Sequence, residues 1–295
     1  MSFLMRLATL SSAGLLAAVL LAPLIKAAVD ALRAAEPGLD SGYDFGRIFR
    51  RLLQISILTA LLAGRRWLTQ GRAIRVRGLR ASQAPWSRFS LGLLFGIVSL
   101  SLFLASHAAW DGGGGLEIRL QPAAAWPPAL AWALLTGLVV AAIEEMIFRG
   151  WLLEALRLST PFAVAALVSS LLYSAAHFVT AAVRVRPGWD FLVGLQALDL
   201  HLRALARPEL AMGFLVLAAA GFVLACAYAW TASLPFAIGI HAGWVFVIKA
   251  APLMVPSMGI AWLHGSGGAL SGIWSLVFLG ALLVVLRFSF GGRRS

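Results

Sequence analysis

The sequence predicts an all-α protein that crosses a membrane about eight times. Hydrophobic residues make up 61% of the chain and charged residues only 12%, with a mean hydropathy of +0.89. Ordinary soluble domains contain about 25% charged residues. The surface of this chain therefore has to be solvated by lipid. Apolar runs of helical length can provide such a surface.

Apolar runs long enough to cross a bilayer recur along the whole chain. A hydrocarbon core about 30 Å thick takes about 20 helical residues to cross. We place the runs near residues 7–29, 47–64, 88–109, 126–148, 161–181, 210–230, 235–253 and 268–288. Together they predict a single transmembrane domain over residues 1–295, with 126–250 as the core that carries the functional motifs.

The first run, residues 7–29, follows Arg6 and contains Pro23 and Lys26. This pattern is shared by cleaved signal peptides and by retained first helices. We favour a retained helix, because the apolar region is long and further apolar runs follow it.

Arginines between the runs predict the orientation, because short cytoplasmic loops are rich in Lys and Arg. The segment between the second and third runs contains no acid and seven arginines: Arg65, Arg66, Arg72, Arg75, Arg77, Arg80 and Arg88. Residues 111–119 contain two acids and one arginine. We therefore expect a multi-pass protein of the plasma (inner) membrane with both termini cytoplasmic. The net charge of +12 then indicates contact with anionic lipid rather than with nucleic acid.

Residues 182–209 place leucines at helical spacing, with Asp199 and Arg203 between them. This pattern predicts a helix lying in the membrane interface. It fits a membrane-surface connector, and a substrate gate is the alternative.

Ionisable side chains near the middle of a bilayer are costly and mark functional sites. Three apolar runs of this chain carry such groups. The fourth ends in Glu144-Glu145-Met146-Ile147-Phe148-Arg149-Gly150, the fifth contains Tyr173-Ser174-Ala175-Ala176-His177, and the seventh contains Gly239-Ile240-His241-Ala242-Gly243-Trp244-Val245. Each motif alone fits an interfacial ion pair or a packed core histidine, but their coincidence favours one site.

Helical geometry separates the two glutamates. Glu145 and Arg149 are four residues apart, so they lie on one helical face and can form an ion pair. Glu144 is rotated by about 100° from Glu145. It remains available as a general base.

The three motifs in this order resemble the CPBP family, which comprises CAAX prenyl endopeptidases and bacterial relatives implicated in bacteriocin processing. The resemblance implies an intramembrane endopeptidase in which Glu144 activates water. The Glu145–Arg149 pair would position Glu144. His177 and His241 would hold the water and stabilise the oxyanion. The family's last motif usually has Asn where this chain has Val245, so the Trp244 indole is a candidate substitute donor. Tyr173 stands where the family usually has Phe.

The resemblance leaves metal use open. Two His and two Glu could bind zinc, but we favour a site without a cofactor. The partners would be membrane lipid and a peptide or protein cleaved near the membrane. Two alternatives remain: an inactive relative that acts as a scaffold or chaperone, and a proton-coupled transporter, against which the lack of repeat symmetry speaks.

Overall fold

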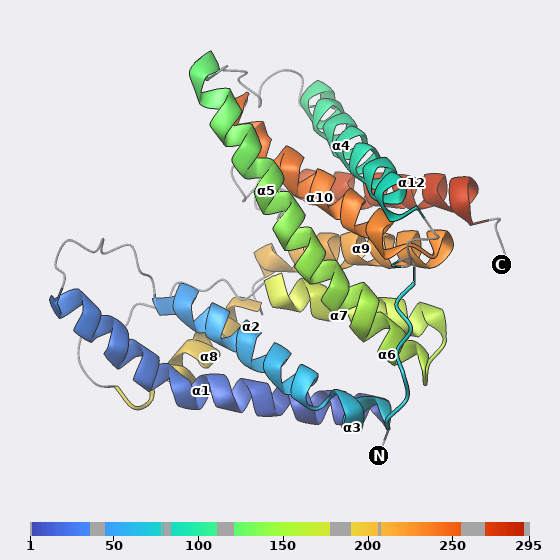
Figure 1. The fold of residues 1–295 in the computed structure, drawn as a ribbon. Coiled ribbons are helices and arrows are strands. Elements are labelled where there is room, and N and C mark those ends of the chain that lie inside the picture. Colours follow the sequence, from blue (N-terminus) through green and yellow to red (C-terminus); the bar gives the residue numbers. More distant parts are fainter. Residues whose placement is uncertain are drawn as a thin grey trace. The chain divides into compact units, whose positions relative to one another are not determined.

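The helices of the chain are seen in a computed structural model that describes residues 2–35, 45–77, 79, 84–110, 121–177, 190–205, 208–254 and 269–291 (Figure 1). Those residues contain helices and no strand, which confirms the predicted all-α fold. They divide into two compact units. The prediction of a single domain over residues 1–295 stays a prediction.

The first unit comprises residues 1–73 and 175–211. Its helices are α1 (Phe3–Ala35), α2 (Phe45–Ala63), α3 (Arg65–Thr69) and α8 (Val193–Leu205). A small core of α1, α2 and α8 side chains includes Val19, Phe49 and Ala197. Gly194 brings the α8 backbone against the carbonyl of Val19, because a Cβ at this position would collide with that oxygen.

The second unit comprises residues 74–174 and 212–295. Its helices are α4 (Pro85–Trp110), η2 (Ala123–Ala125), α5 (Trp126–Glu145), η3 (Met146–Leu153), α6 (Glu154–Arg157), most of α7 (Phe162–His177) and of α9 (Pro208–Thr231), α10 (Leu234–Ala250), η4 (Ala251–Leu253) and α12 (Ala269–Phe290). A hydrophobic core joins α4, α9, α10 and α12.

All of the predicted apolar runs form helices in the described residues. Six of these helices are long and apolar enough to span a membrane, so the chain is a multi-pass membrane protein. The other two are α7, which is shorter, and α2, which begins with Arg47, Arg50 and Arg51. Residues 182–209 do contain the predicted helix, α8. The acidic segment 111–119 that supported the orientation lies outside the described residues.

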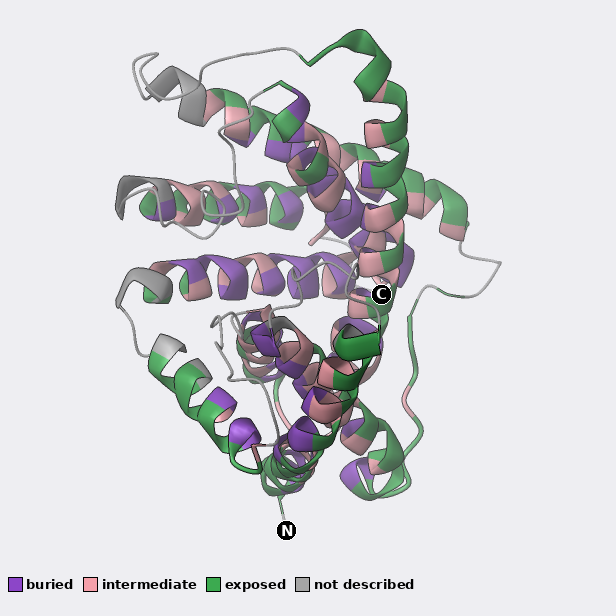
Figure 2. Ribbon diagram, turned by 90° about the vertical axis from the view of Figure 1, so that its left-hand side faces the viewer, coloured by how far each residue is buried: buried purple, intermediate pink, exposed green. Residues whose placement is uncertain are grey.

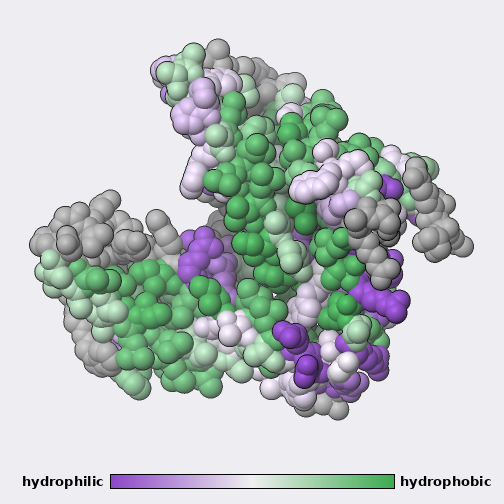
Figure 3. Space-filling model, viewed as in Figure 1, coloured by the Kyte–Doolittle hydropathy of each residue, from purple (hydrophilic) through white to green (hydrophobic). Residues whose placement is uncertain are grey.

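Buried and exposed residues separate along the helices (Figure 2). The outward face of α5 carries a stripe of large apolar side chains, whereas α10 is mostly buried. Figure 3 shows hydrophobic surface on helices of both units. Exposed apolar faces of this kind are expected when lipid is the solvent. The α5 stripe consists of Trp132, Leu135, Val139 and Ile143, and the exposed Met146 at the start of η3 continues it.

Helix α10 packs backbone to backbone on α4 through glycines on both helices. Cβ atoms at Gly92 and Gly96 would collide with the carbonyls of Phe236 and Ile240. In return, Gly239 and Gly243 of α10 leave no room for a Cβ against the α4 backbone. Small residues at four-residue spacing allow this close approach of membrane helices. The glycine face therefore fixes the rotation of α10, which carries His241.

Candidate active site

The first motif lies where an α-helix changes into a π-helix. Glu145 is the last residue of α5, and Arg149 lies in η3, whose backbone has the wider π-helical turn. The Ser169 hydroxyl of α7 donates to the carbonyl of Phe148 inside this segment at 3.0 Å. Single π-helical turns inside α-helices occur frequently at functional sites. The π-helical backbone therefore already indicates that this segment belongs to a functional site.

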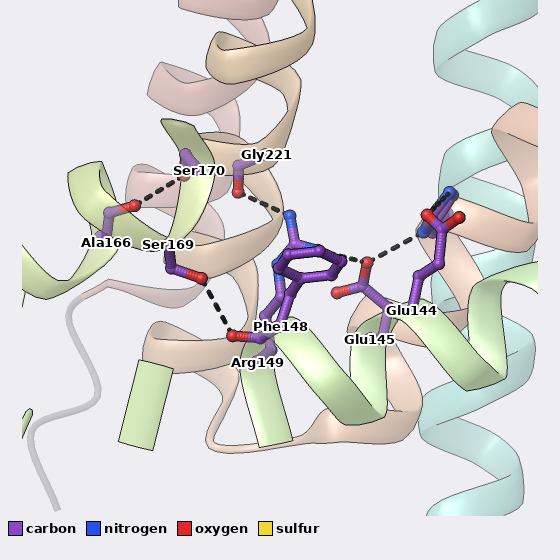
Figure 4. A network of polar contacts seen from close by, with 9 residues as sticks. Glu144, Glu145, Phe148, Arg149, Ala166, Ser169, Ser170 and Gly221 are labelled. Atoms are coloured by element: carbon purple, nitrogen blue, oxygen red, sulfur yellow. Dashed lines mark hydrogen bonds and ion pairs between the residues drawn. The ribbon is translucent and has the colours of Figure 1, made fainter. Parts of the chain in front are cut away.

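Glu145 and Arg149 form the ion pair that their spacing predicts. Nη1 of Arg149 donates to Oε1 of Glu145 at 2.8 Å, and the two side chains are 1% and 0% exposed. Nη2 of Arg149 donates to the carbonyl of Gly221 on α9 at 3.0 Å (Figure 4). Two hydrogen bonds from the charged guanidinium, one to a carboxylate and one to a backbone carbonyl, thus compensate part of the cost of burying it.

The Arg149 guanidinium is also held by aromatic rings. Its Cζ lies 4.7 Å from the centroid of the Tyr173 ring, and that ring meets Phe148 edge to face at 5.3 Å. A cation over an aromatic face is stabilised by the ring quadrupole. Gly221 lets α9 approach, because a Cβ there would come within 3.1 Å of Tyr173. Tyr173 therefore takes part in this site by packing its ring against the Arg149 guanidinium.

His241 lies between the two glutamates. Its Nδ1 is 2.9 Å from Oε1 of Glu145, and its Nε2 is 3.8 Å from Oε2 of Glu144. The Tyr173 ring meets the imidazole edge to face at 6.1 Å. The two sides of the ring thus face different carboxyl groups, one in hydrogen-bonding contact and one just beyond it.

The rotation of α10 explains why His241 faces the glutamates. Gly239 and Gly243, which pack on α4, are each two residues from His241, and two residues are about 200° around an α-helix. His241 therefore points away from α4. Gly137 of α5 lies close to the carbonyl of Ala242, the residue after His241. Helix α5, which carries the glutamates, is therefore the helix that His241 faces.

The two glutamates differ in how far their side chains are exposed. The side chain of Glu144 is 24% exposed, whereas that of Glu145 is 0% exposed. Since a general base must reach a reacting water molecule, Glu144 is the better placed of the two. Glu145 is confined to contacts inside the protein.

The structure brings together Glu144, Glu145, Arg149, Tyr173 and His241. His177 is the last residue of α7 and falls in the first unit, where the carbonyl of the preceding Ala176 accepts a hydrogen bond from Gln54 of α2 at 2.6 Å. Its role in the site stays a prediction.

Trp244 and Val245, one turn after His241, lie on α10 with different surroundings. The indole N–H of Trp244 donates to the Ser99 hydroxyl of α4 at 3.1 Å. Val245 is half-buried and has no polar group. For Trp244 to serve as an oxyanion donor, its N–H would have to leave Ser99, so this role stays a prediction.

Sequence reasoning missed three partners of the site: the carbonyl of Gly221, the Ser169 hydroxyl and the bond between Glu145 and His241. Only Ser169 could have been noted from the sequence, as a polar residue in an apolar run one turn before Tyr173. A backbone carbonyl carries no sequence signal. Within the described part of the chain, no group of three or more His, Cys, Asp or Glu is arranged to hold a metal ion.

Comparison with known protein families gives one match. Residues 125–247 match the family model described as type II CAAX prenyl endopeptidase Rce1-like. This segment contains all three motifs, and it agrees with the predicted core of 126–250. No curated protein matches the chain significantly, and no solved structure does. The predicted resemblance is therefore confirmed over this segment.

Proposed function

We propose, on the premise that residues 125–247 carry the Rce1-like family's core, that this chain is an intramembrane endopeptidase that uses Glu144 as its general base. The family suggests a protease whose substrate is a peptide or protein in the membrane. The finer proposal rests on one observation. Nε2 of His241 lies 3.8 Å from the partly exposed Glu144, while the more deeply buried Glu145 holds the other side of the ring.

The chemistry follows from this arrangement. Glu144 takes a proton from water as the oxygen attacks the peptide carbonyl carbon, and the C–N bond then breaks as the nitrogen receives a proton. A histidine beside the base can stabilise the charge that develops on the carbonyl oxygen. The family resemblance assigns His177, four residues after Tyr173 on α7, a role in holding the water.

Hydrolysis by the purified protein tests the proposal. We expect wild-type protein in liposomes to cleave a membrane-anchored peptide substrate, and in H₂¹⁸O the new carboxyl terminus should gain one ¹⁸O atom, as seen by mass spectrometry. A His241→Gln variant in matched liposomes should cleave much more slowly. We propose a site without metal, so a chelator should leave the wild-type rate unchanged. Equal cleavage by the His241→Gln variant would contradict the proposed site, and loss of activity that added zinc restores would contradict the metal-free mechanism.

Val245 favours a second candidate function. The family usually has an Asn here as a second oxyanion donor, and the Trp244 N–H is engaged by Ser99. A chain without this donor could act as a membrane scaffold that binds a partner without cleaving it. A protease cleaves its substrate and a scaffold does not. Restoring the missing oxyanion donor and measuring cleavage therefore distinguishes the two functions.

The Val245→Asn variant should cleave faster than wild type if the missing donor limits the rate. One oxyanion donor contributes about 10² to 10³ in rate, so a gain of roughly tenfold is expected from an imperfectly placed Asn. Initial rates on one substrate measure it. Trp244→Phe is the companion variant: if Trp244 has replaced the Asn, that variant loses activity and Val245→Asn gains none. No cleavage by any of the three proteins, each folded, would favour the scaffold.

The orientation belongs to the same proposal. We propose that residues 65–88, with their seven arginines, face the cytoplasm, and that both chain termini do so too. The proposed partners are anionic lipid and a peptide precursor or membrane-proximal protein segment.

A further inference from the structure

We infer that Glu145 is a positioning residue for His241, which holds the proton on Nδ1 and leaves Nε2 to exchange protons with water and substrate. The inference rests on the proposed protease function and assigns Glu145 a task beyond its ion pair with Arg149. The observation behind it is the bond of 2.9 Å between Nδ1 of His241 and Oε1 of Glu145.

The Arg149 contact decides which atom of this bond donates. Arginine is always protonated and only donates, and its Nη1 reaches the same Oε1 at 2.8 Å. Paired with Arg149 as a carboxylate, Glu145 has only acceptor atoms to offer. Nδ1 of His241 must then be the donor in its own bond with Oε1. The carboxylate thereby selects one imidazole tautomer.

The neighbouring contacts hold this carboxylate in place. Arg149 is anchored on its far side by the carbonyl of Gly221 and the ring of Tyr173. The glycines of α10 fix the rotation of the helix that carries His241. Neither Glu145 nor His241 can turn without breaking these contacts. A rigid partner of this kind is how a buried carboxylate orients a catalytic histidine.

The selected tautomer assigns the task of each ring nitrogen. With Nδ1 committed to Glu145, Nε2 accepts a proton when the ring is neutral and donates one when it is protonated. This nitrogen is the one that faces Glu144, at 3.8 Å. The proton that Glu144 takes from water can therefore pass to Nε2, which then donates a proton to the leaving nitrogen.

Nitrogen NMR on the intact protein tests the tautomer without any assay of activity. We would label histidine with ¹⁵N, reconstitute wild type in lipid nanodiscs, and assign His241 by the signal that disappears in the His241→Gln variant. With the ring in its neutral form, at alkaline pH, Nδ1 should carry the single ring proton. A His241 with its proton on Nε2 and none on Nδ1 overturns the inference.

A pair of variants then tests the positioning role. Glu145→Ala/Arg149→Met removes the carboxylate without leaving a buried cation unpaired. The matched control is Glu154→Gln/Arg157→Met, which removes the partly exposed ion pair further along the same helix. Only the first variant should shift His241 toward the Nε2–H tautomer. Its kcat should be about 10 to 100-fold below that of the control, the usual effect of losing a group that orients another, with KM unchanged.

The two arms separate the failure of the inference from that of the proposed function. If wild type cleaves its substrate but both variants share one kcat and one tautomer, the positioning role is overturned and the protease remains. If Nδ1 is protonated but wild type cleaves nothing, the protease proposal fails on its own.

Discussion

Replacing Glu144 by glutamine should lower the cleavage rate by about 10² to 10⁴-fold, which is the contribution of a general base. Glutamine keeps the size and the polarity of the side chain but cannot accept a proton from water. The remaining contacts of the site are unchanged, so substrate binding should persist. Initial rates in proteoliposomes and the KM of the residual activity measure the effect.

Glu154→Gln is the matched control. Glu154 pairs with Arg157 at 3.1 Å and lies on the same continuous helix as Glu144. It is ten residues from Glu144, or about 15 Å along a helix. Its substitution should leave the rate near the wild-type value. Wild-type turnover by Glu144→Gln would rule out the mechanism, whereas equal loss in both variants would indicate a general effect of removing a helix carboxylate.

The pairing of Glu145 with Arg149 could be predicted because local spacing alone decides it. Four residues along one helix place the two side chains together, whatever the rest of the fold does. The membrane class was predictable for a similar reason, since lipid demands apolar runs of fixed length. Both predictions depend on distances along the chain, and both are confirmed.

The position of His241 between the glutamates depends on contacts across the fold. It requires α10 to pack on α4 through four glycines, which the separate runs did not reveal. The π-helical segment from Met146 to Leu153 also arises from tertiary contacts, such as the Ser169 hydroxyl on the carbonyl of Phe148. The sequence therefore indicated which residue types gather at the candidate site but not which atoms meet.

The count of about eight spans shows where hydropathy alone is a weak guide. Helix α2 has the right length, but three arginines at its start remove it from the clear candidates. Helix α7 has sixteen residues, so it is short for a full crossing. Apolar composition predicted that these segments are helical, which they are.

Replacing Arg149 by alanine should lower the free energy of unfolding by about 3 to 5 kcal/mol, the cost of breaking a buried ion pair. The substitution leaves the fully buried Glu145 carboxylate without its cation and removes the donor to the carbonyl of Gly221. It also empties the space over the Tyr173 ring. Unfolding of the purified protein in mixed micelles with increasing SDS measures the loss.

Arg157→Ala is the control for this prediction. Its side chain is 24% exposed, and it pairs with Glu154 near the end of the helix. A pair with this access to solvent contributes about 1 kcal/mol or less. The difference between the two arginine variants therefore isolates the effect of burial. Equal losses would mean that the Glu145–Arg149 pair is solvated.

A double substitution tests whether the Glu145–Arg149 pair does more than stabilise the fold. The Glu145→Leu/Arg149→Met variant removes both charges together, so neither is left buried and unpaired. Replacing a buried ion pair with apolar residues is often neutral for stability. We expect the double variant to recover most of the stability that Arg149→Ala loses, yet to cleave poorly, because His241 has lost the carboxylate that orients it. Recovery of stability and cleavage together would show that the pair serves the fold alone.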